Sequence, residues 1–207
     1  METVDLRLES PFAYVTLNRP EVKNAINRQL TRDLLTTFND LRDNTDIRAI
    51  VLSGAGKTFC AGGDLKEMRE SGGDPSGDYD FDKLLQAIMY APQVVIARVE
   101  GAAMGGGFGM VCVSDIVIAS LHVTMGLPEV QLGIAPAFIS PYVIQRIGLN
   151  RARELMLTGR RFDGSEAQEY GVVNEVVAAD MLDVRLNQLL DEIRECSPQA
   201  IRAIKGL

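Results

Sequence analysis

The chain has 207 residues, of which 46% are hydrophobic and 24% charged, a composition typical of a globular protein that buries a core of its own. Its 21 lysines and arginines against 28 aspartates and glutamates give a formal net charge of −7. This balance disfavours nucleic acid as a partner, because phosphate binding needs a basic face. The longest apolar tract, residues 94–113, carries Arg98, Glu100 and several glycines, so we expect no membrane-spanning segment.

The cysteines and the N-terminal residues indicate the cellular compartment in which the protein is expected. Cys60, Cys112 and Cys196 are far apart in the sequence, and His122 is the single histidine. A sparse, odd number of cysteines is typical of a reducing compartment, and with one histidine it argues against a zinc site. The first residues, METVDLRLESPF, lack both the apolar core of a signal peptide and the arginine-rich pattern of a transit peptide. We therefore expect a cytoplasmic protein without a metal.

Strand-like and helix-like segments alternate along the chain, which is typical of an α/β fold with crossover connections. Alternating or continuous apolar runs predict strands, and apolar residues at helical spacing predict helices. From about Ile139 the pattern becomes almost wholly helical, and residues 71–78, rich in Gly, Ser, Asp and Pro, predict a mobile surface loop. In chain order the predicted elements are strands 4–8 and 13–17, helix 28–41, strand 49–52, helix 82–89, strands 94–99 and 116–119, helices 151–157 and 165–170, strand 172–176 and helix 180–193.

Residues 51–64, VLSGAGKTFCAGGD, form a glycine-rich segment after a predicted strand and contain a GKT triplet like the end of a P-loop. A P-loop requires another glycine five residues before Gly56, where this chain has Val51, and it continues directly into a helix. Here the chain continues to Phe59 and Cys60 instead. We therefore reject a P-loop at this segment, and without a paired histidine we interpret Cys60 as a small apolar filler.

Residues 101–109, GAAMGGGFG, form a second glycine-rich segment whose spacing resembles the cofactor loop of short-chain dehydrogenases. A dinucleotide site also needs an acidic residue about 20 residues further on, where this chain has Ser120 and Leu121. The Tyr-xxx-Lys pair of that family is missing downstream, because Tyr142 and Tyr170 are followed at that distance by an arginine and an asparagine. The sequence thus argues against a dinucleotide cofactor.

A third interpretation fits both glycine-rich segments together. A glycine-rich turn between a strand and a helix leaves backbone N–H groups free to point at one spot. Two such turns can each aim one N–H at a developing oxyanion, and Gly63 and Gly106 are suited to this because glycine permits close approach. From spacing alone, the alternative that these glycines only permit tight turns or close helix packing stays open and is the commoner case.

Five motifs follow one another along the chain: LNRP at 17–20 with Asn24 and Ala25, residues 51–65, residues 101–115, GLPE at 126–129 and LTGR at 157–160. In these motifs and their order, the chain resembles the crotonase (enoyl-CoA hydratase/isomerase) superfamily over essentially its whole length. The resemblance implies an α/β core of repeated ββα units in two roughly perpendicular sheets, followed by C-terminal helices that build trimers, often stacked as hexamers. With the helical pattern above, it divides the chain into a core with the active site at residues 1–138 and a helical extension at 139–207 that ends before the last helices of the family.

Carried over by motif, the resemblance makes Gly63 and Gly106 the two oxyanion donors that hold an acyl-thioester carbonyl, and Glu129 the acid/base carboxylate. The apolar neighbours of Glu129 predict a raised pKa suited to proton transfer, although a glutamate after Pro128 is more commonly a solvated charge. Coenzyme A is part of the substrate, so no separate cofactor is implied. The implied substrate-binding residues, the first three at the coenzyme A rim, are Val22, Lys23, Ala25, Ala61, Gly63, Asp64, Leu65, Lys66, Gly106 and Gly109.

One departure from the family pattern concerns Gly109, which stands where two-carboxylate hydratases have a second glutamate. A single Glu129 suits allylic isomerisation, which needs one base, but it can also hydrate a double bond in one concerted step. Residues 132–142, LGIAPAFISPY, resemble the branch that acts on methylglutaconyl-type acyl-CoAs and also accepts glycine at this position. We therefore expect an enoyl-CoA hydratase, with a Δ3,Δ2-enoyl-CoA isomerase or a non-catalytic acyl-CoA-binding paralogue as alternatives.

The segment before the second glycine-rich loop has one further feature. Phe81, Leu84, Leu85, Ile88 and Met89 fall on a single helical stripe. Such a stripe either lines an acyl pocket or forms part of the core, and the sequence leaves both interpretations open.

Overall fold

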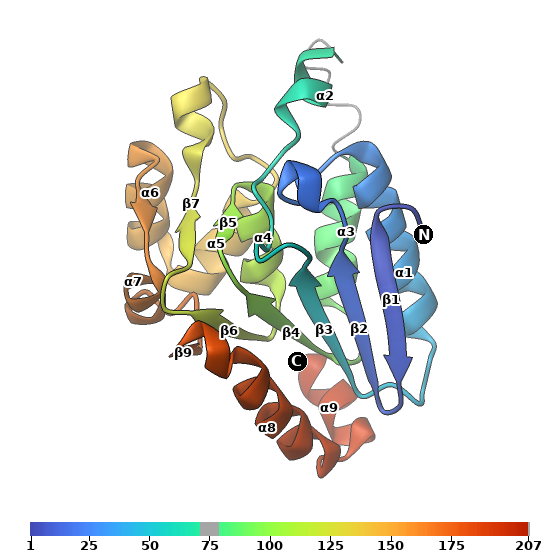
Figure 1. Ribbon diagram of the computed structural model, residues 1–207. Helices are drawn as coiled ribbons and strands as arrows, with labels where there is room; N and C mark the ends of the chain where they lie inside the picture. Colours follow the sequence, from blue (N-terminus) through green and yellow to red (C-terminus); the bar gives the residue numbers. More distant parts are fainter. Residues whose placement is uncertain (71–78, 207) are drawn as a thin grey trace.

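The computed structural model describes residues 1–70 and 79–206, so the loop predicted at 71–78 lies outside the described residues. A six-stranded sheet in the order β1-β2-β3-β4-β6-β9 forms the centre of the molecule (Figure 1). β1 and β2 form an antiparallel hairpin, and every later neighbour pairs in parallel. The strands are β1 (Val4–Glu9), β2 (Phe12–Leu17), β3 (Ala49–Gly54), β4 (Val94–Val99), β6 (Ile116–Ser120) and β9 (Glu175–Val177).

The central strands are apolar on both faces because helices cover both sides, as is usual for parallel sheets. Along β3, Ile50 and Leu52 belong to the larger core cluster, which contains apolar residues of α1 (Arg28–Arg42). The alternate residues of β3 face a smaller cluster formed with α8 (Leu182–Arg194). α1 begins where the sequence predicts, since the Asn27 side chain accepts a hydrogen bond from the Leu30 N–H at 2.8 Å.

A second sheet is built from the ends of the repeated units. β4 is followed by β5 (Ala102–Met104), and β6 by β7 (Thr124–Gly126), and each of these short strands leads towards a helix. With β8 (Arg161–Phe162) they form a three-stranded sheet in the order β5-β7-β8, and in Figure 1 β7 runs steeply across the direction of β6. The expected α/β fold with ββα units in two sheets is confirmed.

Of the remaining helices, α3, α6 and α7 agree with predicted helices, whereas α2, α4, α5 and α9 were not predicted individually. α4 was not predicted because seven of its eight residues are buried, and a helix that is apolar all round shows no periodicity. The part of the chain after residue 138 is mainly helical. β9 overlaps the strand predicted at 172–176 and pairs within the six-stranded sheet, whereas β8 was not predicted and pairs within the three-stranded sheet. The helices are α2 (Leu65–Glu70), α3 (Tyr79–Met89), α4 (Gly106–Val113), α5 (Ser140–Ile147), α6 (Leu149–Thr158), α7 (Gly164–Glu169) and α9 (Pro198–Lys205).

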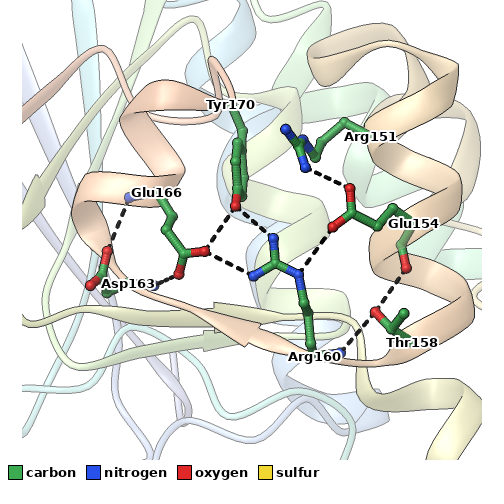
Figure 2. Close-up of polar contacts among 7 residues, drawn as sticks. All are labelled: Arg151, Glu154, Thr158, Arg160, Asp163, Glu166 and Tyr170. Carbon is green, nitrogen blue, oxygen red and sulfur yellow. Dashed lines mark hydrogen bonds and ion pairs between the residues drawn. The ribbon is translucent and has the colours of Figure 1, made fainter.

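Arg160 of the LTGR motif joins α6, β8 and α7 (Figure 2). Its guanidinium donates to the Tyr170 hydroxyl at 2.6 Å and to Glu166 Oε1 at 2.9 Å, and its Nε lies 3.3 Å from Glu154 Oε1. Asp163 and Glu166 form a capping box at the start of α7. We refer to Glu154, Arg160, Glu166 and Tyr170 as the arginine cluster. Across residues 1–70 and 79–206, no helix is long and apolar enough to cross a membrane.

Candidate active site

The two glycine-rich segments lie side by side because a short β-bridge joins them. Cys60 pairs with Ala103 of β5: the Cys60 N–H donates to the Ala102 carbonyl at 2.8 Å, and the Met104 N–H donates to the Cys60 carbonyl at 3.0 Å. Gly62 follows with φ +99°, and a Cβ there would lie 3.1 Å from the Met104 carbonyl oxygen. Only glycine permits this backbone-to-backbone approach, which brings the turns of the two segments into contact.

Each turn leaves an N–H without an acceptor. Gly63 forms a bridge with Ile26, in which the Gly62 carbonyl and the Asp64 N–H make the hydrogen bonds, at 2.7 and 2.8 Å. Gly106 is the first residue of α4, so its N–H precedes the intrahelical bonds. Among the described residues, neither N–H has a hydrogen-bond acceptor. The structure therefore brings together the two predicted oxyanion donors, each with its N–H available.

The carboxyl group of Glu129 lies against the same turn. Glu129 is in the 3₁₀ helix η3 (Pro128–Leu132), directly after β7. Gly105 has φ +52°, and a Cβ on it would lie only 2.9 Å from Glu129 Oε1, so both the dihedral and the contact require glycine. Glu129 Oε2 is buried, and no described group hydrogen-bonds to it. Burial raises the pKa of Glu129 by more than its own backbone hydrogen bond lowers it, which confirms the expected direction.

The predicted coenzyme A rim lies beside these turns. Lys23 ends the 3₁₀ helix η1 (Pro20–Val22) with φ +54°, and its carbonyl accepts the Ala61 N–H at 3.0 Å. This bond ties Val22, Lys23 and Ala25 to the segment that carries Gly63. The exposed residues of this surface include Val22, Lys23, Ala61, Leu65 and Lys66.

Residues 7–206 match the family model described as Enoyl-CoA hydratase/isomerase. The chain belongs to this family. It is 32% identical over 209 residues to the short-chain-enoyl-CoA hydratase of Clostridium acetobutylicum, covering 99% of this chain and 80% of that protein. Among solved structures it is similar to AtuE of Pseudomonas aeruginosa (TM-score 0.96, 43% identity, 99% of this chain and 81% of that one). It is also similar to an enoyl-CoA hydratase/isomerase from Marinobacter aquaeolei (TM-score 0.95, 41% identity, 99% and 82%).

Two polar residues of this candidate site escaped the sequence reasoning, although the first motif contains both. Arg19 donates to Asp64 Oδ2 at 3.1 Å and to the carbonyl of Ala25. It thereby connects the predicted coenzyme A rim to the segment that carries Gly63. Asn24 is buried, and its amide donates to the carbonyls of Ala55 and Thr58 at 2.9 and 2.7 Å. A polar side chain within a family motif is a signal that could have identified them as positioning residues.

Asp64, predicted to bind substrate, has its carboxylate engaged within the protein. Burial raises its pKa, but hydrogen bonds from Arg19 and from the N–H groups of Glu67 and Lys66 outweigh this, and the net shift is downward. The same N–H contacts make Asp64 the cap of α2, with the Lys66 N–H at 3.1 Å from Oδ1. Its observed role is therefore to hold the segment after Gly63 in place.

The sequence left open whether the apolar stripe on α3 lines an acyl pocket or forms part of the core, and its residues differ in this respect. Leu84, Leu85 and Ile88 are fully buried in the core. Phe81 is partly buried, and its ring edge would lie 3.0 Å from a Cβ on Gly106, so this residue borders the site. Gly109, by contrast, is buried against Ile139 and is not brought to the open surface with the other candidates.

Among the described residues, Cys60 does not provide a reactive thiolate, and the acidic side chains do not form a metal site. Burial raises the pKa of the Cys60 thiol to about 12, so it stays protonated and serves as an apolar filler beneath the glycine turns. In residues 1–70 and 79–206, no three His, Cys, Asp or Glu side chains converge in a way that could hold a metal ion.

Proposed function

We propose that the chain is an enoyl-CoA hydratase that adds water to the double bond of a 2-enoyl-CoA. The observation that carries the proposal is the Glu129 carboxyl, whose buried Oε2 lacks a described partner, beside two turns with available N–H groups. A buried carboxylate oxygen without a donor is costly to stability and is typical of sites that transfer protons. Membership of the enoyl-CoA hydratase/isomerase family supports the same reaction class.

In this mechanism the thioester carbonyl oxygen accepts hydrogen bonds from the N–H groups of Gly63 and Gly106. Glu129 accepts a proton from water as the oxygen of that water bonds to C3 of the substrate. Negative charge then develops on the thioester oxygen, where the two N–H groups stabilise it. Glu129 delivers the proton to C2, so that water is added as H and OH and the carboxylate is regenerated.

We further propose a branched, methylglutaconyl-like acyl group, supported by the sequence similarity of residues 132–142 noted above. The rim at Val22, Lys23 and Ala25 would contact coenzyme A, which enters as part of the substrate, so no separate cofactor is required. We also propose that the chain works as a homotrimer or hexamer in the cytoplasm, as the family resemblance implies.

Δ3,Δ2-Enoyl-CoA isomerisation is the second candidate, and the chemistry of Gly109 favours it. This reaction moves one proton between C2 and C4, for which a single carboxylate is sufficient. Gly109 supplies no side chain for a second acid or base. The same Gly63, Gly106 and Glu129 would serve both reactions, so only the products distinguish them.

The test is a panel of thioesters: crotonyl-CoA, 3-methylglutaconyl-CoA and a 3-enoyl-CoA, each measured for binding by calorimetry and for turnover by product analysis. Hydration of the 2-enoyl-CoAs supports the proposal, and conversion of the 3-enoyl-CoA alone supports the isomerase. Binding without any turnover identifies a non-catalytic paralogue, whereas no binding overturns all three. Glu166→Gln, at a glutamate outside the site, is the matched control for Glu129→Gln.

A further inference from the structure

The side chain of Ile139 occupies the space that any side chain at position 109 would need. A Cβ on Gly109 would lie 2.5 Å from Ile139 Cγ2 and 3.2 Å from Ile139 Cβ, whereas Leu85 Cδ2 would be at an ordinary 3.8 Å. Carbon atoms in contact normally lie about 3.5–4.0 Å apart. The restriction at position 109 therefore comes from one residue, Ile139.

Ile139 has little freedom to move away. It is 3% exposed and belongs to the main core cluster. It precedes the first residue of α5, and its carbonyl accepts the Val143 N–H at 3.0 Å. As a β-branched residue it has few alternative rotamers. A larger residue at 109 could be accepted only by displacing the start of α5.

The filled space belongs to the wall of the site. Gly106 and Gly109 are three residues apart on α4 and so share one helix face. That face packs against α3, with Phe81 close to Gly106 and Leu85 beside Gly109, and Ile26 also lies against Gly106. Ile139 closes the same face from the side of α5. The wall next to the oxyanion donor is thus apolar, and the structure leaves no place on it for a carboxylate.

We infer that Ile139 is a specificity-determining residue that, paired with Gly109, commits the site to a single carboxylate. Its side chain excludes a second acid from α4 and leaves proton transfer to Glu129. The inference rests on the proposed function for its chemical consequence, but its packing basis can be tested without any activity.

The packing test measures the melting temperature of Gly109→Ala in three backgrounds. In the parent chain, overpacking against Ile139 should lower Tm by about 2–12 °C. In an Ile139→Gly background the clash is removed, and replacing a helix-interior glycine by alanine should instead raise Tm by about 1–4 °C. Leu85→Ala is the matched control, since it opens a cavity near Gly109 without removing the clashing atoms and should leave Gly109→Ala destabilising.

The catalytic test adds the missing acid with and without Ile139. Gly109→Glu alone should unfold more readily or lose activity, whereas Gly109→Glu with Ile139→Gly should hydrate at least about tenfold faster than Gly109→Glu alone. The pH profile of kcat/KM should show one carboxylate ionisation in the parent and a second in the double variant, a change that a purely structural role of Ile139 does not produce.

The outcomes separate the inference from the proposed function. An equal fall in Tm for Gly109→Ala in all three backgrounds overturns the inference, whatever the activity. A folded double variant with no second ionisation also overturns it. If the parent turns over no enoyl-CoA while the sign of the Tm change reverses, the proposed function fails, but the exclusion of a side chain at 109 by Ile139 stands.

Discussion

Glu166 and Glu129 are the same residue type at the first turn of a short helix, yet the structure gives them opposite surroundings. Glu166 accepts hydrogen bonds from Arg160, Tyr170 and the Asp163 N–H, and these contacts hold its pKa below the usual range (Figure 2). Glu129 is partly buried, with a fully buried Oε2 that has no partner among the described residues, and burial raises its pKa.

This difference shows which carboxylate the fold uses for stability and which it keeps for chemistry. A carboxylate with several donors is fixed in its charged form and has no proton to exchange near neutral pH. A buried carboxylate without donors exchanges a proton more readily, at a cost in stability. The following experiments test this distinction, in order of the size of the expected effect.

The largest effect is expected from Glu129→Gln. The amide keeps the size of the side chain but cannot transfer the proton, so turnover should fall by roughly 100- to 10,000-fold. The decisive measurement is exchange of the α-proton of a bound acyl-CoA in deuterated water. Glu166→Gln should exchange like the parent. If Glu129→Gln also exchanges as fast as the parent, Glu129 is not the acid/base group.

Gly106→Pro removes one N–H from the oxyanion site. Proline is well accepted at the first position of a helix, which is where Gly106 stands, so the fold should persist. Losing one such donor typically costs on the order of 100- to 1000-fold in turnover.

Gly106→Ala is the control for that substitution. Its Cβ meets the same Ile26 and Phe81 atoms, at 2.8 and 3.0 Å, but it keeps the N–H. The ratio of kcat between the alanine and proline variants therefore isolates the N–H, with circular dichroism to verify folding. A ratio near one contradicts the role of Gly106 as a donor.

The sequence predicted those parts of the molecule that depend on local patterns or on the motifs. β4 matches its prediction at both ends because it is an apolar run interrupted only by Arg98, whereas the all-apolar α4 and the short strands β5, β7 and β8 carry no periodic signal. In the candidate site, the motifs pointed to Gly63, Gly106 and Glu129, and the structure places these three residues around the same pair of turns. Contacts between distant residues were beyond reach, since neither the Ile139 contact with Gly109 nor the Arg19 pairing with Asp64 leaves a local trace.

A moderate loss of stability, without loss of catalysis, is expected from Arg160→Met. The substitution removes the hydrogen bonds to Glu166 and Tyr170 and the ion pair with Glu154. Since the Arg160 side chain is 32% exposed, the unfolding free energy should fall by only about 1–2 kcal/mol. Denaturant unfolding measures the loss, and kcat should stay within about twofold of the parent, because none of the side-chain contacts described for Arg160 involves Gly63, Gly106 or Glu129.

Lys83→Met is the matched control for Arg160→Met. It breaks one surface ion pair, with Asp80 at 3.1 Å, and should cost no more than about 0.5 kcal/mol. If both variants lose the same stability, the arginine cluster contributes no more than an ordinary surface pair.

The smallest effect is the pH dependence of stability, in which the two glutamates should act with opposite sign. Glu166, with a lowered pKa in the folded state, contributes stability that is present above its unfolded pKa of about 4.3 and is lost as the pH falls through the folded value. Glu129, with a raised pKa, contributes stability that is present below about pH 4.3 and is lost as the pH rises through the folded value.

Unfolding free energies of the parent and the two glutamine variants, measured from about pH 3 to 8, resolve these contributions. Relative to the parent, Glu129→Gln should gain stability as the pH rises above about 4.3, because the parent must then bury a charge that the variant lacks. Relative to the parent, Glu166→Gln should lose stability at lower pH, as the pH rises towards about 4.3, because the parent then gains its charge-assisted bonds to Arg160 and Tyr170. Since Glu166 is 37% exposed, its curve should change by less than about 1 kcal/mol. If the two difference curves have the same sign, Glu129 and Glu166 titrate alike, and the contrast drawn between these two carboxylates is wrong.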